Sequence, residues 1–210
     1  MTEEGQLAQG VHAVPIGGDL VLLDLAADDY LLFADCGDVA VLGERLRGPM
    51  DTLLELASAE LLHSGPARPA CVPPPPLPLH SLPEISGRRP RLAEIAAFGA
   101  IWADRAWRRP TLAGLAAAHG DRTGRRDDLE MIAARAQTFF QLLLFAPRTG
   151  ACLFQAEMLL RFLNAGDLDA DWVFGVRAWP FLAHCWLQVD DVCVSQSAET
   201  LSHFHPILVI

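Results

Sequence analysis

The spacing of apolar and polar residues near the N-terminus predicts short β-strands. Val11–Ile16 forms one apolar run, which ends at Gly17 and Gly18. Residues 20–25 are apolar at almost every position, so their length and valine content indicate a strand but assign it no buried face. Residues 26–29 supply turn chemistry, and residues 30–34 are expected to return as the partner strand of a hairpin.

The spacing becomes helical after residue 38. Residues 38–46 and 51–63 are both predicted to be helices, with Asp51 as the N-cap of the second and Gly65 beyond its end. The second helix has an apolar stripe made of Leu53, Leu54, Leu56, Ala57 and Leu61. The predicted order is therefore β-β-β-α-α, in a module too small to enclose a deep active site.

A proline-rich stretch divides the chain. Residues 65–83 include Pro73-Pro-Pro-Pro-Leu-Pro78, and this density of proline is incompatible with a helix or the interior of a sheet. The charge balance changes at the same place, because residues 1–80 carry 12 acidic and 3 basic side chains and residues 81–210 carry 14 and 13. We therefore predict a domain at residues 1–64, an extended linker at 65–84 and a second domain at 85–210.

The second predicted domain begins with helices and ends with strands. Helical spacing covers residues 92–108, 111–119 and 127–145, and a further amphipathic helix begins at Cys152. Three strand-like runs follow at residues 172–176, 181–189 and 192–195, which predicts an antiparallel meander. The fold class expected for the whole chain is α+β.

Composition excludes several classes of function. No apolar run reaches the ~18–20 residues of a membrane span, and the N-terminus lacks a signal sequence, so we expect a cytoplasmic protein with no membrane association. All 16 basic residues are arginine, which excludes a Walker A phosphate loop, a Schiff base and a Ser–Lys dyad. The acidic first domain argues against nucleic acid and suits a basic or neutral peptide. Any ATP used with this protein would have to be bound by another protein.

The cysteines and histidines carry the candidate chemistry. Five cysteines without a tight CxxC pair indicate reduced thiols. Cys152 follows Gly150 at the start of a helix, where free backbone N–H groups favour a thiolate. His184 lies on a predicted strand that can pack against that helix, and a thiol beside an imidazole is suited to acyl transfer. A single cysteine is more often a buried apolar residue, and Cys185 and Cys193 are interpreted in that way.

A third group is needed to orient the imidazole of His184. A three-residue hairpin turn centred on Asp190 would set Gln196 opposite His184, whereas a two-residue turn would set Ser197 there. The sequence leaves both open. His203 and His205 form an HxH pair, but no second ligand pair accompanies them, so we predict neither a metal nor another cofactor.

Several motifs stand out in residues 85–210: Cys152-Leu with its helix, Trp172-Val-Phe-Gly-Val, Pro180-Phe-Leu-Ala-His-Cys-Trp, Phe204-His-Pro-Ile and the Arg- and Ala-rich helices from Arg91. Through these motifs, residues 85–210 resemble the leader peptidase of lasso-peptide biosynthesis, a member of the transglutaminase-like cysteine peptidases. Residues 1–80 contain Leu22-Leu-Asp-Leu and Tyr30-Leu-Leu-Phe, followed by two predicted helices. Through these, residues 1–80 resemble the PqqD-like element that recognises leader peptides.

The resemblance implies roles for particular residues and partners. Cys152 would be the nucleophile and His184 the base, while Gln196 stands where the family usually has an aspartate. The partners implied are the leader of a ribosomally made precursor peptide and a separate ATP-dependent cyclase of the asparagine-synthetase-like kind. The leader would add as a strand and contact Tyr30, Leu31, Leu32, Phe33, Leu54, Ala57 and Leu61.

Two other functions remain open on the sequence. The missing aspartate is also compatible with an inactive chaperone or adapter that only binds leaders. The same thiol chemistry would also serve a transglutaminase or amidase that acts on side-chain amides.

Overall fold

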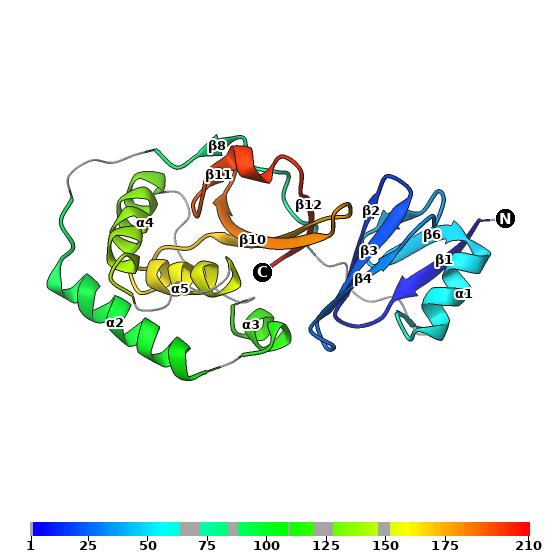
Figure 1. The fold of residues 1–210 in the computed structure, drawn as a ribbon, viewed down its shortest axis with the longest axis horizontal. Helices are drawn as coiled ribbons and strands as arrows, with labels where there is room; N and C mark the ends of the chain where they lie inside the picture. The colour runs from blue at the N-terminus through cyan, green and yellow to red at the C-terminus, as the bar shows by residue number, and fades with distance from the viewer. Residues whose placement is uncertain (1, 64–71, 84–87, 109, 120–127, 147–151) are drawn as a thin grey trace.

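The computed structural model describes residues 2–63, 72–83, 88–108, 110–119, 128–146 and 152–210. It confirms the α+β fold class: an N-terminal part built mostly of β-sheet precedes a part with four helices and a second set of strands among the described residues. Figure 1 shows the two parts side by side along the longest axis of the molecule. The predicted domain boundaries fall in or beside residues 64–71 and 84–87, which lie outside the described residues.

The predicted hairpin is present in the N-terminal part. Strands β2 (Val11–Ile16), β3 (Asp19–Asp24) and β4 (Asp29–Phe33) form an antiparallel sheet in the order β2-β3-β4. The middle strand is buried on both faces, because Leu20 and Leu22 pack in the core of the N-terminal part while Val21 and Leu23 pack in the core of the C-terminal part. This double burial explains the uniformly apolar sequence of β3 and leaves β4 at a sheet edge.

The predicted helix at residues 38–46 is wrong. This segment forms β5 (Ala40–Leu42) and β6 (Arg45–Pro49), joined by a turn at Gly43, whose φ of 66° suits glycine. The second of these strands pairs along its length with β1 (Thr2–Leu7), a strand that the sequence analysis did not identify. Backbone partners from the start of the chain therefore outweigh the local helical spacing.

The second predicted helix is shorter than expected. Helix α1 covers Met50–Ser58, and the chain turns at Glu60, where φ is 60°. Leu61 follows this turn, and β7 (Leu62–His63) pairs with β1. The element order of the N-terminal part is thus six strands, one helix and one strand, in place of β-β-β-α-α.

The C-terminal part combines four described helices with one sheet, on which α5 packs. The helices are α2 (Leu92–Trp107), α3 (Leu112–His119), α4 (Leu129–Leu143) and α5 (Cys152–Asn164). The strands are β9 (Asp171–Arg177), β10 (Leu182–Val189), β11 (Val192–Cys193) and β12 (His205–Val209), in the order β12-β9-β10-β11-β8. The predicted meander β9-β10-β11 is confirmed, whereas β12 was not predicted as a strand.

The proline-rich segment contributes the last strand of this sheet. β8 (His80–Ser81) pairs in parallel with β11, at the sheet edge. The Pro76 carbonyl accepts a hydrogen bond from the Gln188 side chain at 3.1 Å. Within the described residues 72–83, the segment therefore packs on the C-terminal part. An extended linker was not expected to make these contacts.

Helix α5 is held at the centre of the C-terminal part. Its apolar side chains pack against β10, α2 and α4. The buried carboxylate of Glu157 accepts a hydrogen bond from Arg105 of α2, and Arg161 pairs with Asp104 of α2 at 2.8 Å. Removing one partner of a buried ion pair typically costs about 3–5 kcal/mol. These contacts fix the position of α5, and with it the position of Cys152.

The two parts meet at two places, where β2 packs against β12 and around the β3–β4 hairpin. The Trp179 indole donates to Asp19 at 2.5 Å, and the backbone N–H of Leu112 donates to Asp28 at 3.3 Å. The rings of Tyr30 and Phe181 lie 5.9 Å apart. Figure 1 shows the turn between β3 and β4 reaching toward α3. The β3–β4 hairpin of one part thus lies beside α3 and the β9–β10 turn of the other.

Candidate active site

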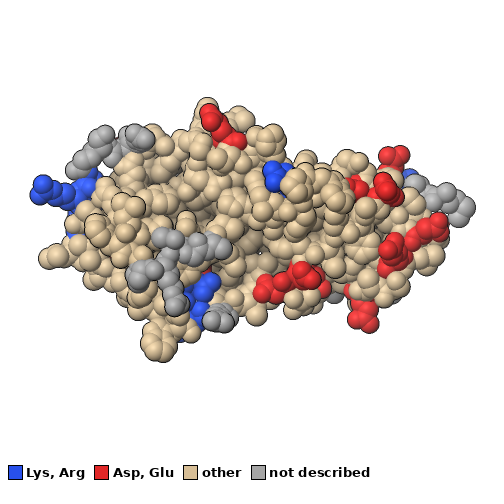
Figure 2. Space-filling model, viewed as in Figure 1, with Lys and Arg blue, Asp and Glu red and all other residues tan. Residues whose placement is uncertain are grey.

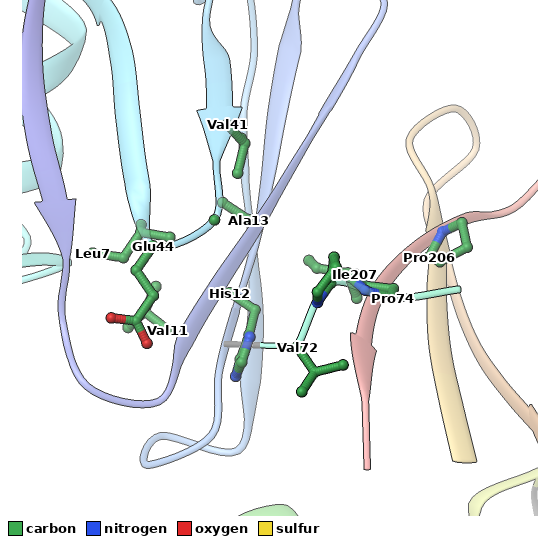
Figure 3. A pocket seen from close by; sticks show the side chains of 12 residues that line it. Leu7, Val11, His12, Ala13, Val41, Glu44, Val72, Pro74, Pro206 and Ile207 are labelled. Atoms are coloured by element: carbon green, nitrogen blue, oxygen red, sulfur yellow. The ribbon is translucent and has the colours of Figure 1, made fainter. Parts of the chain in front are cut away.

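One cavity between the two parts contains no nucleophile. This cavity of about 180 Å³ lies between β2, the proline-rich segment and β12 (Figure 3). The ionisable side chains that line it are His12 and Glu44. Burial lowers the pKa of His12, and the nearby Glu44 carboxylate opposes that shift. An imidazole and a carboxylate without a thiol or hydroxyl do not form a covalent catalyst, so the candidate chemistry lies elsewhere.

Cys152 begins helix α5, as the sequence predicted. The residue expected to open the helix, Gly150, lies outside the described residues. The backbone N–H groups of a first helical turn have no partner within the helix, so they stabilise a negative charge on the sulfur. The side chain of Cys152 is half-buried and borders two cavities.

His184 and Gln196 meet directly. The imidazole Nε2 of His184 lies 2.8 Å from the Oε1 of Gln196, although the two residues are 12 positions apart. The Gln196 amide nitrogen donates to Thr200 Oγ1 at 3.1 Å, and that hydroxyl donates to the Ser197 carbonyl at 2.7 Å. Because the single hydroxyl proton of Thr200 is already used, Thr200 can only accept from the amide.

This hydrogen-bond chain sets the tautomer of the histidine. With the amide nitrogen turned to Thr200, the amide oxygen of Gln196 faces His184, so Nε2 must carry a proton. The other ring nitrogen, Nδ1, is then free to exchange a proton with the Cys152 sulfur. A neutral amide can therefore perform the orienting role of a carboxylate at this position.

The strand register alone does not explain why Gln196 contacts His184. Val189 pairs with Val192, so the hairpin turn has two residues, the case expected to place Ser197 opposite His184. The ladder ends at Cys193, and the Ser195 hydroxyl then accepts the Leu187 N–H at 3.0 Å. The chain bends after this contact, and the Gln196 side chain, not that of Ser197, reaches the imidazole.

Hydrogen bonding shifts the pKa values of Cys152 and His184 in the directions that favour an ion pair. The pKa of Cys152 falls to about 4, first because the Cys185 thiol donates a hydrogen bond to it and second because His184 does, although burial opposes the shift. The pKa of His184 is raised, mainly by its hydrogen bond to Cys152 and also by Gln196, again against burial. At neutral pH this favours a thiolate beside an imidazolium, the reactive state of a cysteine nucleophile.

Cys185 takes part in the site, which sequence reasoning missed. It was interpreted as a core residue, and it is indeed only 4% exposed. Its thiol nevertheless hydrogen-bonds to Cys152, and this contact together with burial raises its pKa well above the ordinary value. Cys185 therefore keeps its proton and donates it to the thiolate. Its position next to His184 in the strand was the only signal in the sequence.

Two cavities share Cys152, His184 and Cys185 in their walls. One, of about 250 Å³, is lined by Cys152, His184, Cys185 and Gln196 together with Phe140, Gln155, Ala156, Leu159 and Ser195. The other, of about 160 Å³, also reaches Cys152 and His184 but extends toward the N-terminal part. A chain that crosses the thiol would therefore have space on both sides of the bond to be attacked.

The predicted peptide-contacting residues do not all share one surface. Tyr30 borders the second cavity, and Leu32 packs with the C-terminal core, whereas Leu31 and Phe33 point into the N-terminal core. Leu61 is 3% exposed and offers no side chain to a peptide.

The predicted helix residues lie away from the β4 edge. Leu54 and Ala57 are exposed on α1, which packs against β1, β6 and β7, in the other sheet from β4. Figure 1 shows this helix on the far side of the N-terminal part. The structure thus does not join α1 and β4 into a single groove.

Other polar residues stay outside the site. The Gln137 side chain donates to the Pro83 carbonyl at 3.1 Å, so it is directed at the proline-rich segment. His203 and His205 are both exposed. Within the described ranges, no group of three or more histidine, cysteine or acidic side chains could hold a metal ion. In the same ranges, no helix is long and apolar enough to cross a membrane.

Comparisons with known proteins agree with this chemistry. Residues 96–209 match the family model described as the transglutaminase-like superfamily. The matched range includes Cys152, His184 and Gln196 and excludes the N-terminal part. No curated protein and no solved structure matches the chain significantly.

Proposed function

The chain belongs to the transglutaminase-like superfamily, whose members carry out cysteine-peptidase or acyl-transfer chemistry, and from this we propose that it is a leader peptidase. The proposed substrate is the precursor of a ribosomally made lasso peptide, cut between leader and core. The observation that carries the proposal is the pair of Cys152 and His184, set beside the edge strand β4 of a separate sheet.

The site supports a two-step acyl transfer. The Cys152 thiolate attacks the scissile carbonyl carbon, and backbone N–H groups at the start of α5 are suited to stabilise the oxyanion. The C–N bond then breaks while the His184 imidazolium gives its proton to the departing amine. The thioester left on Cys152 is hydrolysed by a water that His184 deprotonates, which releases the leader acid and restores the thiol.

The edge strand supports recognition of an extended peptide. β4 pairs on one side with β3 and has no strand on its other side among the described residues. Free backbone groups at a sheet edge pair readily with an added strand. Acidic side chains gather over the N-terminal part on the face shown in Figure 2, which favours a basic or neutral leader. We propose that residues 1–64 act as the PqqD-like leader-recognition element.

The remaining partners follow from the same proposal. With no lysine, the chain lacks the usual means of holding ATP phosphates. Closure of the macrocycle would then be the task of a separate ATP-dependent, asparagine-synthetase-like cyclase, to which the freed core N-terminus passes. The reaction would occur in the cytoplasm, where the precursor is made and thiols stay reduced.

The test is cleavage of the precursor encoded beside the gene of this protein. The purified full chain should cut that peptide at one bond, and mass spectrometry should detect the leader and the core. Incorporation of a primary amine into a glutamine side chain, without cleavage, would instead support a transglutaminase. A Cys152 that iodoacetamide does not alkylate at neutral pH would support the inactive adapter.

We also propose that Gln196 orients the imidazole of His184. Gln196→Ala should lower turnover by roughly 10–10³-fold, less than loss of His184, because general-base catalysis is worth about 10²–10⁴-fold. Gln196→Asp should retain turnover and raise the pKa of His184, because a carboxylate stabilises the imidazolium. Thr200→Val should act in the same direction as Gln196→Ala, but more weakly. pH–rate profiles of these variants test this, and unchanged rates in all three would remove Gln196 from the catalytic site.

Leader binding should depend on the outward N–H groups of β4. Successive N–H groups of an edge strand point alternately to the neighbouring strand and away from it. Of Leu31→Pro and Leu32→Pro, one should unfold the sheet, and the other should keep its fold but lose about tenfold or more in leader affinity. Fluorescence polarisation in a Cys152→Ala background measures binding, and circular dichroism measures folding. If Leu31→Pro or Leu32→Pro keeps its fold and binds the leader with full affinity, strand addition is contradicted.

A further inference from the structure

The cavity of about 160 Å³ beside Cys152 is built by both parts of the molecule. Asp28 and Tyr30 come from the β3–β4 hairpin of the N-terminal part. The C-terminal part contributes Leu112, Cys152, Leu153, Phe174, Ala183, His184 and Cys185. Because Cys152 and His184 are among these residues, a group that fills the cavity touches the reacting atoms.

The walls of this cavity are almost entirely apolar. Leu112 and Phe174 are 5% and 2% exposed, and Tyr30 also lines the cavity. The one carboxylate on the wall, that of Asp28, accepts the backbone N–H of Leu112 at 3.3 Å, at the start of α3. Apolar cavities of about 150 Å³ hold a benzene-sized group, so this one has the size of a single apolar side chain.

The position of the cavity indicates which side chain it receives. Tyr30 lies on the edge strand that we propose receives the leader, and it also borders the cavity. A leader paired with β4 would therefore approach Cys152 from the side of this cavity. Its C-terminal residues would lie nearest to the thiol. The acyl side of the scissile bond belongs to the leader, so these residues carry the side chain nearest the sulfur.

We propose that this cavity is a specificity subsite for an apolar side chain at the C-terminal end of the leader, and that Tyr30 of the N-terminal part forms one of its walls. The inference rests on the proposed leader-peptidase function and extends it. The N-terminal part would thus select the residue at the cleavage site as well as hold the leader. Leucine-sized side chains fit, whereas an acidic side chain is excluded by the apolar walls and by Asp28.

Peptidyl chloromethyl ketones test the subsite without the natural precursor. In these probes the thiolate displaces chloride and forms a thioether, and intact-protein mass spectrometry measures the rate. The set is acetyl-Gly-Gly, Leu-Gly, Gly-Leu, Asp-Gly and Gly-Asp chloromethyl ketone. For each protein, rates are divided by its own alkylation rate with iodoacetamide, which corrects for thiolate reactivity.

We expect one of the two leucine probes to label Cys152 about tenfold or more faster than the all-glycine probe, since a filled apolar pocket discriminates by about 10–200-fold. The matching aspartate probe should be no faster than glycine. Ala183→Leu fills the cavity and should abolish the preference, whereas Ala100→Leu, the same change on the exposed face of α2, should keep it. Tyr30→Ala enlarges the cavity, so the preference should move from leucine to phenylalanine when acetyl-Phe-Gly and acetyl-Gly-Phe chloromethyl ketone are added to the set.

Three failures are distinguishable. Equal labelling by the glycine and leucine probes, or a preference that survives Ala183→Leu, would overturn the subsite while leaving the peptidase proposal intact. A preference unaffected by Tyr30→Ala would overturn the role of the N-terminal part in the subsite. A Cys152 that reacts neither with iodoacetamide nor with any probe would instead overturn the peptidase proposal itself.

Discussion

Cys152→Ala should abolish cleavage of the precursor and leave the affinity for the leader within a few-fold of its original value. Loss of the nucleophile of an acyl-transfer enzyme typically lowers turnover on the order of 10⁴–10⁶-fold. The other catalytic groups assist a reaction through a covalent intermediate, which cannot form without the thiol. Leader affinity should survive because the edge strand β4 belongs to the N-terminal part, whereas the thiol lies on helix α5 of the C-terminal part. Mass spectrometry of the precursor and fluorescence polarisation of a labelled leader measure the two quantities.

The control for Cys152→Ala is Cys193→Ala, which removes another thiol of the C-terminal part. Cys193 is fully buried, and its thiol contacts Ser195 and the backbone of Gln196 but neither Cys152 nor His184, so Cys193→Ala should keep cleavage if the variant folds. Circular dichroism checks folding of both variants. Cleavage retained by Cys152→Ala would reject the covalent mechanism, however well His184 is placed.

His184→Ala should change the pH at which Cys152 becomes reactive. In the unmodified protein the depressed thiol pKa means that iodoacetamide should alkylate Cys152 down to about pH 4, because the thiolate persists above that value. Without His184 the midpoint should rise by one or more pH units toward the ordinary thiol value of about 8.5. Turnover should fall by about 10²–10⁴-fold, since the general base is lost.

The sign of the pH dependence follows from the two pKa shifts. As pH rises through the lowered pKa of Cys152, the thiolate forms and activity appears. As pH rises further, through the raised pKa of His184, the imidazolium is lost and activity declines. The profile should therefore be bell-shaped, and its two limbs belong to the coupled pair.

Cys185→Ala separates the two causes of the low thiol pKa. This variant removes the largest stabilising hydrogen bond to the thiolate but keeps the base, so the acid limb should move to higher pH while the maximum rate falls much less than in His184→Ala. Alkylation rates measured from pH 3 to pH 9 distinguish the variants. An unchanged acid limb in both would show that neither hydrogen bond stabilises the thiolate.

Local sequence determined the parts of the site that depend on local structure. The start of α5 at Cys152, the strand that carries His184 and the hairpin β3–β4 were all visible, because helix and strand periodicity records which face of an element is buried. The absence of lysine, also read directly from the sequence, excludes a Walker A loop and a Schiff base.

Tertiary structure decided everything that depends on a distant partner. Residues 40–49 became strands because β1 supplies their backbone partners, and Gln196 reached His184 because the ladder ended at Cys193 and the chain bent. The meeting of Cys185 with Cys152 and of Tyr30 with the thiol cavity joins segments far apart in sequence. Periodicity reports that a side chain is buried, but only the packed fold determines which group it is buried against.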